Sequence, residues 1–277
     1  QALIEQVLQN PADGDIVPEW QLLAQRLLDC LEQPFSIGDE TLFVGASIGA
    51  ALGPIDGASV EELIRNADLA LYGAKSDGRR TYRFFEAGMD ARAKARRSLE
   101  LELRQAIVDG SFELHYQPLL HLEDGRVSCC EALLRWRHPE RGTISPADFV
   151  PVAEDTGLIN DLGHWVLNTA CREAVNWPDH IHVAVNVSPI QFKSQTLALN
   201  VAAALAASGL APARLELEIT EAVLIRDDDA ALDILHQLRE LGVRIALDDF
   251  GTGYSSLSYL QRFPFDKIKI DRAFIKD

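Results

Sequence analysis

The chain lacks any long uninterrupted run of apolar residues, and basic residues are in the minority. No apolar stretch approaches the roughly 20 residues that a membrane-spanning helix needs, and the N-terminus does not resemble a signal peptide. Lys and Arg number 26 against 42 Asp and Glu, which gives a formal net charge of −16. A nucleic-acid polymer would be repelled by such a surface. We therefore expect a cytoplasmic protein, or the cytoplasmic portion of a membrane-anchored parent, that binds no nucleic-acid polymer.

Cysteine and histidine are scarce and are not grouped. The four cysteines contain no C-x-x-C pair, and the adjacent Cys129 and Cys130 would point to opposite faces of a strand. Among seven histidines, metal-ligand spacing is limited to His180 and His182. A disulfide framework, a thiolate site and a zinc site are thus disfavoured. Any metal ion should be bound by oxygen, which favours Mg²⁺ or Mn²⁺.

Residues 1–88 have the pattern of a small α+β unit. Apolar residues at helical spacing predict a helix over 18–33, and an extended run predicts a strand over 41–52. A capping-box pattern begins a second helix at 59, which a glycine ends near 78. A short strand over 81–85 closes the unit.

Residues 89–110 predict a solvated connector helix, because they are rich in Ala, Arg, Leu and Glu with charges of both signs. From residue 111 to 277, apolar strands alternate with helical patterns, which is typical of a parallel sheet covered by helices. The expected strands are 112–117, 127–134, 181–187, 214–219, 243–248 and 266–270, and the expected helices are 145–154, 160–177, 196–207, 228–241 and a short one after Ser255.

Oxygen-bearing or charged side chains lie at or near the ends of several of these strands. They are Glu131, Asn186, Glu218, Asp248, Asp249 and, on the last strand, Lys269. Asn186 and Glu218 are 32 residues apart, and Glu218 and Asp248 are 30 apart, so each interval holds about one β-α unit. In a barrel of such units the reactive groups lie at the carboxyl ends of the strands. Each carboxylate alone could be a helix cap or a solvated loop end, but together they predict one metal site.

Five motifs in this region resemble the EAL-domain family in order and spacing, over about residues 98–277. They are Glu131-Ala132-Leu133-Leu134-Arg135-Trp136, Asn186-Val187-Ser188, Glu218-Ile219-Thr220-Glu221, the glycine-containing run from Asp248 to Ser256, and Lys267-Ile268-Lys269-Ile270-Asp271. The resemblance implies a TIM-like (β/α)8-type barrel whose first strand is reversed. It also implies metal-dependent hydrolysis of cyclic di-GMP to the linear dinucleotide pGpG, in bacterial signalling, by a homodimer formed through the EAL domain.

The resemblance also assigns roles to residues. The ligands of two divalent ions, Mg²⁺ or Mn²⁺, would be Glu131, Asn186, Glu218, Asp248 and Asp249. Catalysis would depend on Lys269, Asp249 and Glu131, with Lys269 orienting the attacking water or holding a phosphate oxygen. Considered alone, Lys269 could simply solvate an exposed strand end.

Contacts to the substrate and support of a loop follow from the same resemblance. Arg135, Leu134 and Gln117 would bind the nucleotide, and a guanidinium such as that of Arg135 suits a phosphate. Glu221 would accept hydrogen bonds from the loop over residues 249–256. A protein that kept the binding residues and lacked catalysis would be a cyclic di-GMP receptor or regulatory module, which is the alternative to an enzyme.

The N-terminal unit resembles the second half of a GGDEF, or diguanylate cyclase, domain. The matching segments are 46–51, 67–75 and 78–80, in which Lys75 and Arg79 match positions that contact nucleotide phosphates. Their charges also suit the end of a helix. The sequence contains no Gly-Gly-Asp-Glu-Phe, the turn that binds metal in cyclases, so we expect a partial or degenerate domain with a regulatory or dimerising role.

The family's last two β-α units, with a further active-site Glu and a Gln-Gly loop, have no counterpart in this sequence, which ends at Asp277. We expect the sequence to be part of a longer parent with further sensory domains, and the barrel described by residues 111–277 to be incomplete at its C-terminal end.

Overall fold

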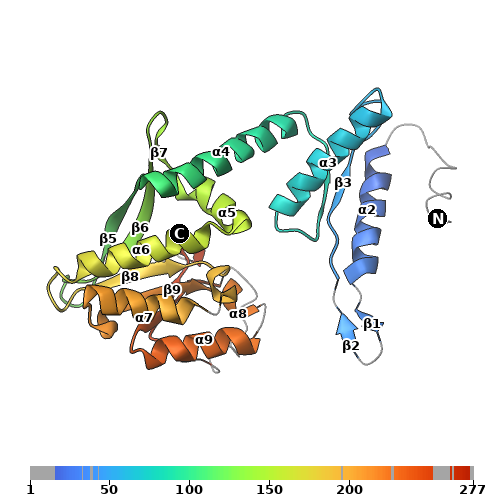
Figure 1. Ribbon diagram of the computed structural model, residues 1–277. Coiled ribbons are helices and arrows are strands. Elements are labelled where there is room, and N and C mark those ends of the chain that lie inside the picture. The colour runs from blue at the N-terminus through green and yellow to red at the C-terminus, as the bar shows by residue number, and fades with distance from the viewer. Residues whose placement is uncertain are drawn as a thin grey trace. The chain divides into compact units, whose positions relative to one another are not determined.

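The computed structural model describes residues 16–32, 34–37, 40–42, 44–194, 196–225, 228–251, 263 and 265–274 (Figure 1). The chain divides into two compact units, Gln1–Arg97 and Ser98–Asp277. The division falls within one helix, α4 (Met89–Asp109). In the described part of the chain, no helix has both the length and the apolar character needed to cross a membrane.

The first unit combines helices with two small sheets. Its elements are α2 (Ile16–Glu32), β1 (Phe35–Ile37), β2 (Glu40–Leu42), β3 (Ile48–Ala50), α3 (Val60–Ser76) and β4 (Tyr82–Phe84). β1 and β2 pair antiparallel, whereas β3 and β4 pair in parallel. The single strand expected over 41–52 is therefore wrong, since its two ends belong to different sheets. Periodicity indicates that both ends are extended and says nothing about their partners.

Helix α3 begins at the predicted capping box. The hydroxyl of Ser59 accepts from the backbone N–H of Glu62 at 3.2 Å, and the Glu62 carboxylate accepts from the backbone N–H of Ala58 at 2.9 Å. The first bond satisfies a backbone donor that the first turn of a helix leaves open, and the second holds the backbone just before the cap. The helix then packs directly on β3. A Cβ added at Gly49 would lie 2.1 Å from the backbone nitrogen of Leu71, so this position requires glycine.

The second unit is a sheet of parallel strands with helices between them. In chain order, after α4, its elements are β5 (Phe112–Leu120), β6 (Val127–His138), β7 (Gly142–Ile144), α5 (Pro146–Thr156), α6 (Ile159–Ala174), β8 (His182–Val187), η1 (Gln191–Lys193), α7 (Leu197–Ser208), η2 (Pro212–Arg214), β9 (Leu215–Thr220), α8 (Ala222–Ile225), α9 (Asp228–Glu240), β10 (Arg244–Phe250), β11 (Lys267–Ile270) and η3 (Arg272–Phe274). The short helix expected after Ser255 lies outside the described residues.

The strand order is β11-β10-β9-β8-β6-β5, with β7 added beside β6. The ladders from β6 through β8, β9 and β10 to β11 are parallel, and β5 is antiparallel to β6. Figure 1 shows α6, α7 and α9 together along one face of this sheet. Their apolar side chains form the main core with β8, β9 and β10. This arrangement confirms the α/β, TIM-like class and the reversed first strand.

Strand β6 is longer than expected. The predicted strand ends at 134, whereas β6 continues to His138, because β5 and β7 pair with its far end, where Trp136 lies opposite both Phe112 and Ile144. Glu131 consequently lies in the middle of β6. The parallel ladder between β6 and β8 nevertheless ends at Ala132. Glu131 therefore still lies at the carboxyl end of the parallel part.

The second half of α4 belongs to the core of the second unit and is not a solvated connector. Leu103 is completely buried and Ala106 nearly so, in a cluster with Trp136 and Phe149. The centres of the Trp136 and Phe149 rings are 5.6 Å apart, edge to face. Charges of both signs along the helix conceal this apolar stripe in the sequence. The expectation of a solvated helix is thus wrong for this half.

Candidate active site

A single ammonium group joins three carboxylates at the carboxyl ends of the strands. Lys269 Nζ on β11 donates to Glu218 Oε2 on β9 and Asp248 Oδ2 on β10, at 2.7 Å each, and to Glu131 Oε2 on β6, at 3.2 Å. The Asn186 amide on β8 donates to Glu131 Oε1 at 2.8 Å. The structure therefore brings together five of the candidate site residues, from five strands.

Strand register explains how residues so distant in sequence meet. Asn186 lies directly opposite Glu218 in the β8–β9 ladder, and Gln117 lies directly opposite Glu131 in the β5–β6 ladder. Side chains at opposed positions project from the same face of a sheet. Because parallel strands end at the same edge, their polar terminal residues gather there.

Asp248 and Asp249 lie at an irregularity in β10. The pairing with β11 steps from Leu247 opposite Ile268 to Phe250 opposite Ile270, so the two aspartates form a β-bulge. Asp249 has a φ of 54°, in the left-handed region that few non-glycine residues adopt. Its backbone N–H donates to Asp248 Oδ1 at 2.9 Å. Strained backbone of this kind is concentrated at functional sites.

The electrostatics of the cluster follow from its burial. Burial raises the pKa of Glu218 to about 7, in spite of the hydrogen bond from Lys269. Burial alone would lower the pKa of Lys269, but the hydrogen bonds to Asp248 and Glu218 outweigh it and the pKa is raised. For Asp249, burial and the neighbouring charge of Asp248 raise the pKa. Lys269 therefore stays protonated at neutral pH, and it partly neutralises the carboxylates around it.

The oxygen atoms of this cluster are suitable ligands for a hard divalent cation. In the structure, the three carboxylates bind the ammonium group of Lys269. Among the described residues, no three His, Cys, Asp or Glu side chains form a ready-made metal site. Glu218 Oε1 is nonetheless buried with no hydrogen-bond partner in the described part of the chain. A buried, unpartnered carboxylate oxygen is costly unless a cation or donor binds it. Every neighbouring ligand candidate offers oxygen, the donor that Mg²⁺ and Mn²⁺ prefer.

The three expected substrate contacts have different surroundings. Gln117 is exposed and lies beside Glu131 across the β5–β6 ladder. Arg135, four residues after Glu131 on the same strand, lies on the same face, and its guanidinium donates to the Leu134 carbonyl at 2.9 Å. The Leu134 side chain packs against both hydrophobic clusters. Leu134 is only partly buried, and its contact with a substrate stays a prediction.

Glu221 supports the start of the predicted loop. It is buried, and its Oε1 accepts from the backbone N–H of Gly251 at 2.9 Å. Gly251 has a φ of 101°, and a Cβ there would lie 2.5 Å from the Phe274 ring, so only glycine fits. Residues 252–256 of the predicted loop lie outside the described residues.

Sequence reasoning missed the residues that hold the backbone after Asn186. The Ser188 hydroxyl donates to Glu154 Oε1 at 2.6 Å, and the Ser188 backbone N–H donates to Gln191 Oε1 at 2.9 Å. Glu154 comes from α5, and nothing in its local sequence indicates a contact 34 residues away. Gln191 is only three residues beyond Ser188. This spacing is typical of turns, so the sequence does indicate a contact between these two residues.

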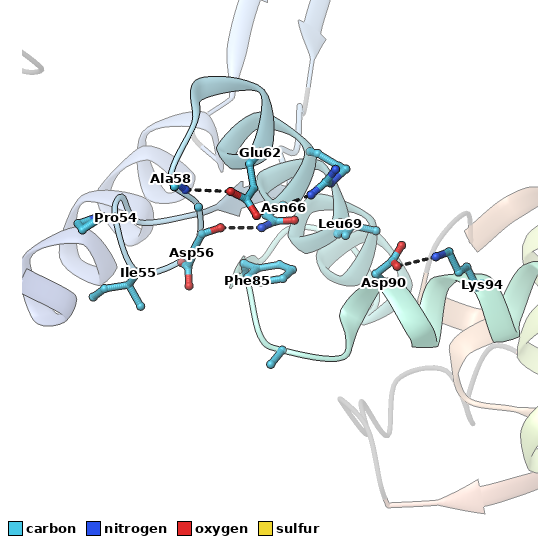
Figure 2. A pocket seen from close by; sticks show the side chains of 13 residues that line it. Pro54, Ile55, Asp56, Ala58, Glu62, Asn66, Leu69, Phe85, Asp90 and Lys94 are labelled. Carbon is cyan, nitrogen blue, oxygen red and sulfur yellow. Dashed lines mark hydrogen bonds and ion pairs between the residues drawn. The ribbon is translucent and has the colours of Figure 1, made fainter.

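In the first unit, Lys75 lies in the last turn of α3, and Arg79 follows with a φ of 64°. The unit has a cavity of about 770 Å³, lined by the loop over 54–58 and the first turns of α3 (Figure 2). Polar groups in its wall bond to one another: Asn66 Nδ2 donates to the Asp56 carbonyl at 2.6 Å. Lys75 and Arg79 do not line this cavity, so it lends no support to the expected phosphate contacts.

Comparison with known proteins matches both units. The EAL domain family matches residues 100–277, and the diguanylate cyclase GGDEF domain family matches residues 8–81. An uncharacterized signaling protein of Caulobacter vibrioides is 51% identical over 96% of this chain and 33% of the relative. The bifunctional diguanylate cyclase/cyclic di-GMP phosphodiesterase MucR of Pseudomonas aeruginosa is 47% identical over 92% of this chain and 38% of the relative.

Among solved structures, the PaMucR phosphodiesterase in complex with c-di-GMP is 48% identical, with a TM-score of 0.62, and the match covers 64% of this chain and 74% of that chain. This chain spans about a third of the length of the curated relatives it matches. With the family match covering most of the chain and the barrel geometry agreeing with it, the chain belongs to the EAL domain family, preceded by part of a GGDEF domain.

Proposed function

We propose that the second unit is a metal-dependent phosphodiesterase that hydrolyses cyclic di-GMP to linear pGpG. The observation that carries this proposal is the convergence of Glu131, Glu218 and Asp248 on the ammonium of Lys269, with Asn186 bound to Glu131. The names of the matched relatives support the substrate, because MucR is named as a cyclic di-GMP phosphodiesterase and the matched PaMucR structure contains c-di-GMP.

The cofactor we propose is a pair of Mg²⁺ or Mn²⁺ ions. The residues that would hold them are Glu131, Asn186, Glu218, Asp248 and Asp249. When bound, divalent ions lower the pKa of coordinated water and neutralise charge on the phosphoryl oxygens. The unpartnered Glu218 Oε1, which is the buried carboxylate oxygen left over from the Lys269 cluster, supports this assignment.

The side chains of the chain itself position the reacting groups. Asn186 fixes the Glu131 carboxylate and leaves its own amide oxygen for a cation. Lys269 remains protonated, so it can hold a phosphate oxygen or orient the attacking water.

Arg135 can bind a phosphate through two parallel N–H bonds, and Gln117 lies on the same side of the sheet. Glu221 ties Gly251 to β9 and so holds the end of β10 that carries both aspartates.

The wider organisation is part of the proposal. We take residues 1–88 as the partial GGDEF-like domain, 89–110 as the connecting helix, whose second half packs in the core of the second unit, and 111–277 as the EAL barrel. A homodimer through the EAL domain is proposed from the family resemblance alone. Nucleotide contacts by Lys75 and Arg79, and a cytoplasmic location, stay predictions.

Hydrolysis assays with a matched pair of variants test the proposal. We expect cyclic di-GMP to be converted to pGpG with Mg²⁺ or Mn²⁺, as followed by chromatography. Glu131→Ala should abolish the product, because it removes a proposed ligand and the acceptor for both Asn186 and Lys269. Glu123→Ala, an exposed glutamate in the turn between β5 and β6, should leave the rate unchanged.

Two outcomes would contradict the proposal. Unchanged turnover by Glu131→Ala would falsify the site assignment. Tight binding of cyclic di-GMP without any product, with either metal, would instead identify the protein as a receptor.

A further inference from the structure

A second charged layer lies inside the barrel, one step from the candidate site towards the amino ends of the strands. On β9, Glu216 precedes Glu218 by two residues, and on β11, Lys267 precedes Lys269 by two. Residues two apart on a strand share a face. Lys267 Nζ donates to Glu216 Oε1, just as Lys269 Nζ donates to Glu218 Oε2. The same ion pair thus occurs twice between these two strands.

These pairs span an intervening strand. β10 lies between β9 and β11, so the lysine and glutamate side chains must meet across it. Ala246 of β10 lies opposite Glu218 on one side and Lys267 on the other, and it is completely buried. Its small side chain leaves the space in which the charged groups meet. A larger residue at 246 would occupy that space.

The glutamate of the inner pair is completely buried, whereas the Lys267 side chain is 30% exposed. Glu216 is 0% exposed, and Arg244 Nε lies 3.9 Å from its second carboxylate oxygen. The Arg244 guanidinium also donates to His182 Nδ1 at 3.2 Å, which holds it in place. Isolating a buried carboxylate from its cations is strongly destabilising. The position of Lys267 is therefore tightly coupled to that of Glu216.

Lys267 is well placed to fix Lys269. At the bulge, two residues of β10, Asp248 and Asp249, stand opposite Lys269 alone, so the regular ladder is interrupted where the Lys269 backbone lies. The last regular rungs before the bulge are at Lys267 and Ile268. The bond from the Lys267 side chain to Glu216 holds β11 in place next to this gap in the ladder.

We propose that Lys267 and Glu216 are positioning residues for the candidate active site: the ion pair of Lys267 with the buried Glu216 carboxylate fixes β11 so that Lys269 lies among its three carboxylates. This inference rests on the proposed function, since it assigns the pair a part in the same hydrolysis. Neither residue would contact the substrate.

Kinetics of matched variants test the proposal. Lys267→Met and Glu216→Gln should each lower kcat about 10- to 100-fold, the range seen when supporting partners of a site are lost, while KM changes less than about threefold. Lys267→Arg, which keeps the charge, should restore most of kcat. Lys94→Met removes a lysine from the exposed pair with Asp90, and it should leave kcat unchanged.

The double variant Glu216→Leu/Lys267→Met replaces the inner ion pair by apolar groups, which proteins often tolerate without loss of stability.

The double variant keeps the test decisive if a single variant fails to fold. A folded double variant with the kcat of the unmodified protein would overturn the proposal. So would single variants whose kcat matches that of Lys94→Met.

A second measurement works without any turnover. Lys269 is half-buried and held by three carboxylates, so it should be acylated slowly by a lysine reagent, as followed by mass spectrometry. Acylation of Lys269 should be at least about tenfold faster in Lys267→Met, the lower end of the range for loss of a supporting partner. The thiol of Cys171, which is completely buried, should stay unreactive and report an intact fold. Unchanged protection of Lys269 would overturn the proposal even in a protein that does not hydrolyse cyclic di-GMP.

Discussion

Two lysines at equal distance from a carboxylate show how differently the two units use charge. In the first unit, Lys94 and Asp90 are 2.7 Å apart, four residues apart in sequence, with side chains 76% and 58% exposed. In the second, Lys269 and Asp248 are also 2.7 Å apart, with side chains 22% and 19% exposed. An exposed pair contributes about 0–1 kcal/mol. A half-buried cluster has a desolvation cost that folding alone does not require, which is why it indicates function.

The largest expected effect comes from removing the central cation. Lys269→Met should lower the free energy of unfolding by about 3 kcal/mol at pH 8 without metal, because three carboxylates then repel one another in a buried site. Urea titration with a chelator present would measure it. The loss should be smaller at pH 5, where the carboxylates can take up protons. A loss no larger than that of Lys94→Met would remove the distinction between the two units.

The next effect has the opposite sign. Burial raises the pKa of Glu218 from 4.5 to about 7. A raised pKa means that the folded state binds this proton more tightly than the unfolded state, so stability is lost as pH rises from about 4.5 to about 7. Glu218→Gln should therefore raise the metal-free stability at pH 8 by at most about 3 kcal/mol and flatten this dependence, while it lowers activity. A destabilised Glu218→Gln protein at pH 8 would contradict this account.

The smallest effect is expected in the first unit. Lys94→Met should change the free energy of unfolding by less than about 0.5 kcal/mol, because the pair is exposed and its charges remain hydrated in either state. Thermal unfolding at low and high salt provides the measurement. If the free energy of unfolding changed by more than about 1 kcal/mol, solvent exposure would not explain how little this ion pair contributes to stability.

Local patterns predicted the strands of the second unit well. β8, β9 and β10 begin and end within two residues of the expected positions, because each is an apolar run bounded by loops. The motif spacing also indicated which residues the structure brings together around Lys269, while their roles as ligands stay a prediction. Periodicity fails where a strand's partners decide its length, as in β6 and in the split of 41–52 into two strands.

The inner pair of Glu216 and Lys267 shows what the sequence alone does not provide. Each residue is visible as a charge two positions before a candidate site residue. Their contact depends on the register of β9 and β11 across β10, and register between strands 51 residues apart is a property of the whole sheet. The same holds for Glu154, whose contact with Ser188 depends on where α5 packs.

The burial of Leu103 and Ala106 has a practical consequence for any isolated fragment of the EAL domain. A fragment beginning at Phe112, where the first strand starts, would lose the half-helix that covers Trp136 and Phe149. Trp136, on the strand that carries Glu131 and Arg135, and Phe149, on α5, would then lose that cover. A fragment beginning at Ser98 keeps them covered, so the first residue chosen decides whether this part of the core stays intact.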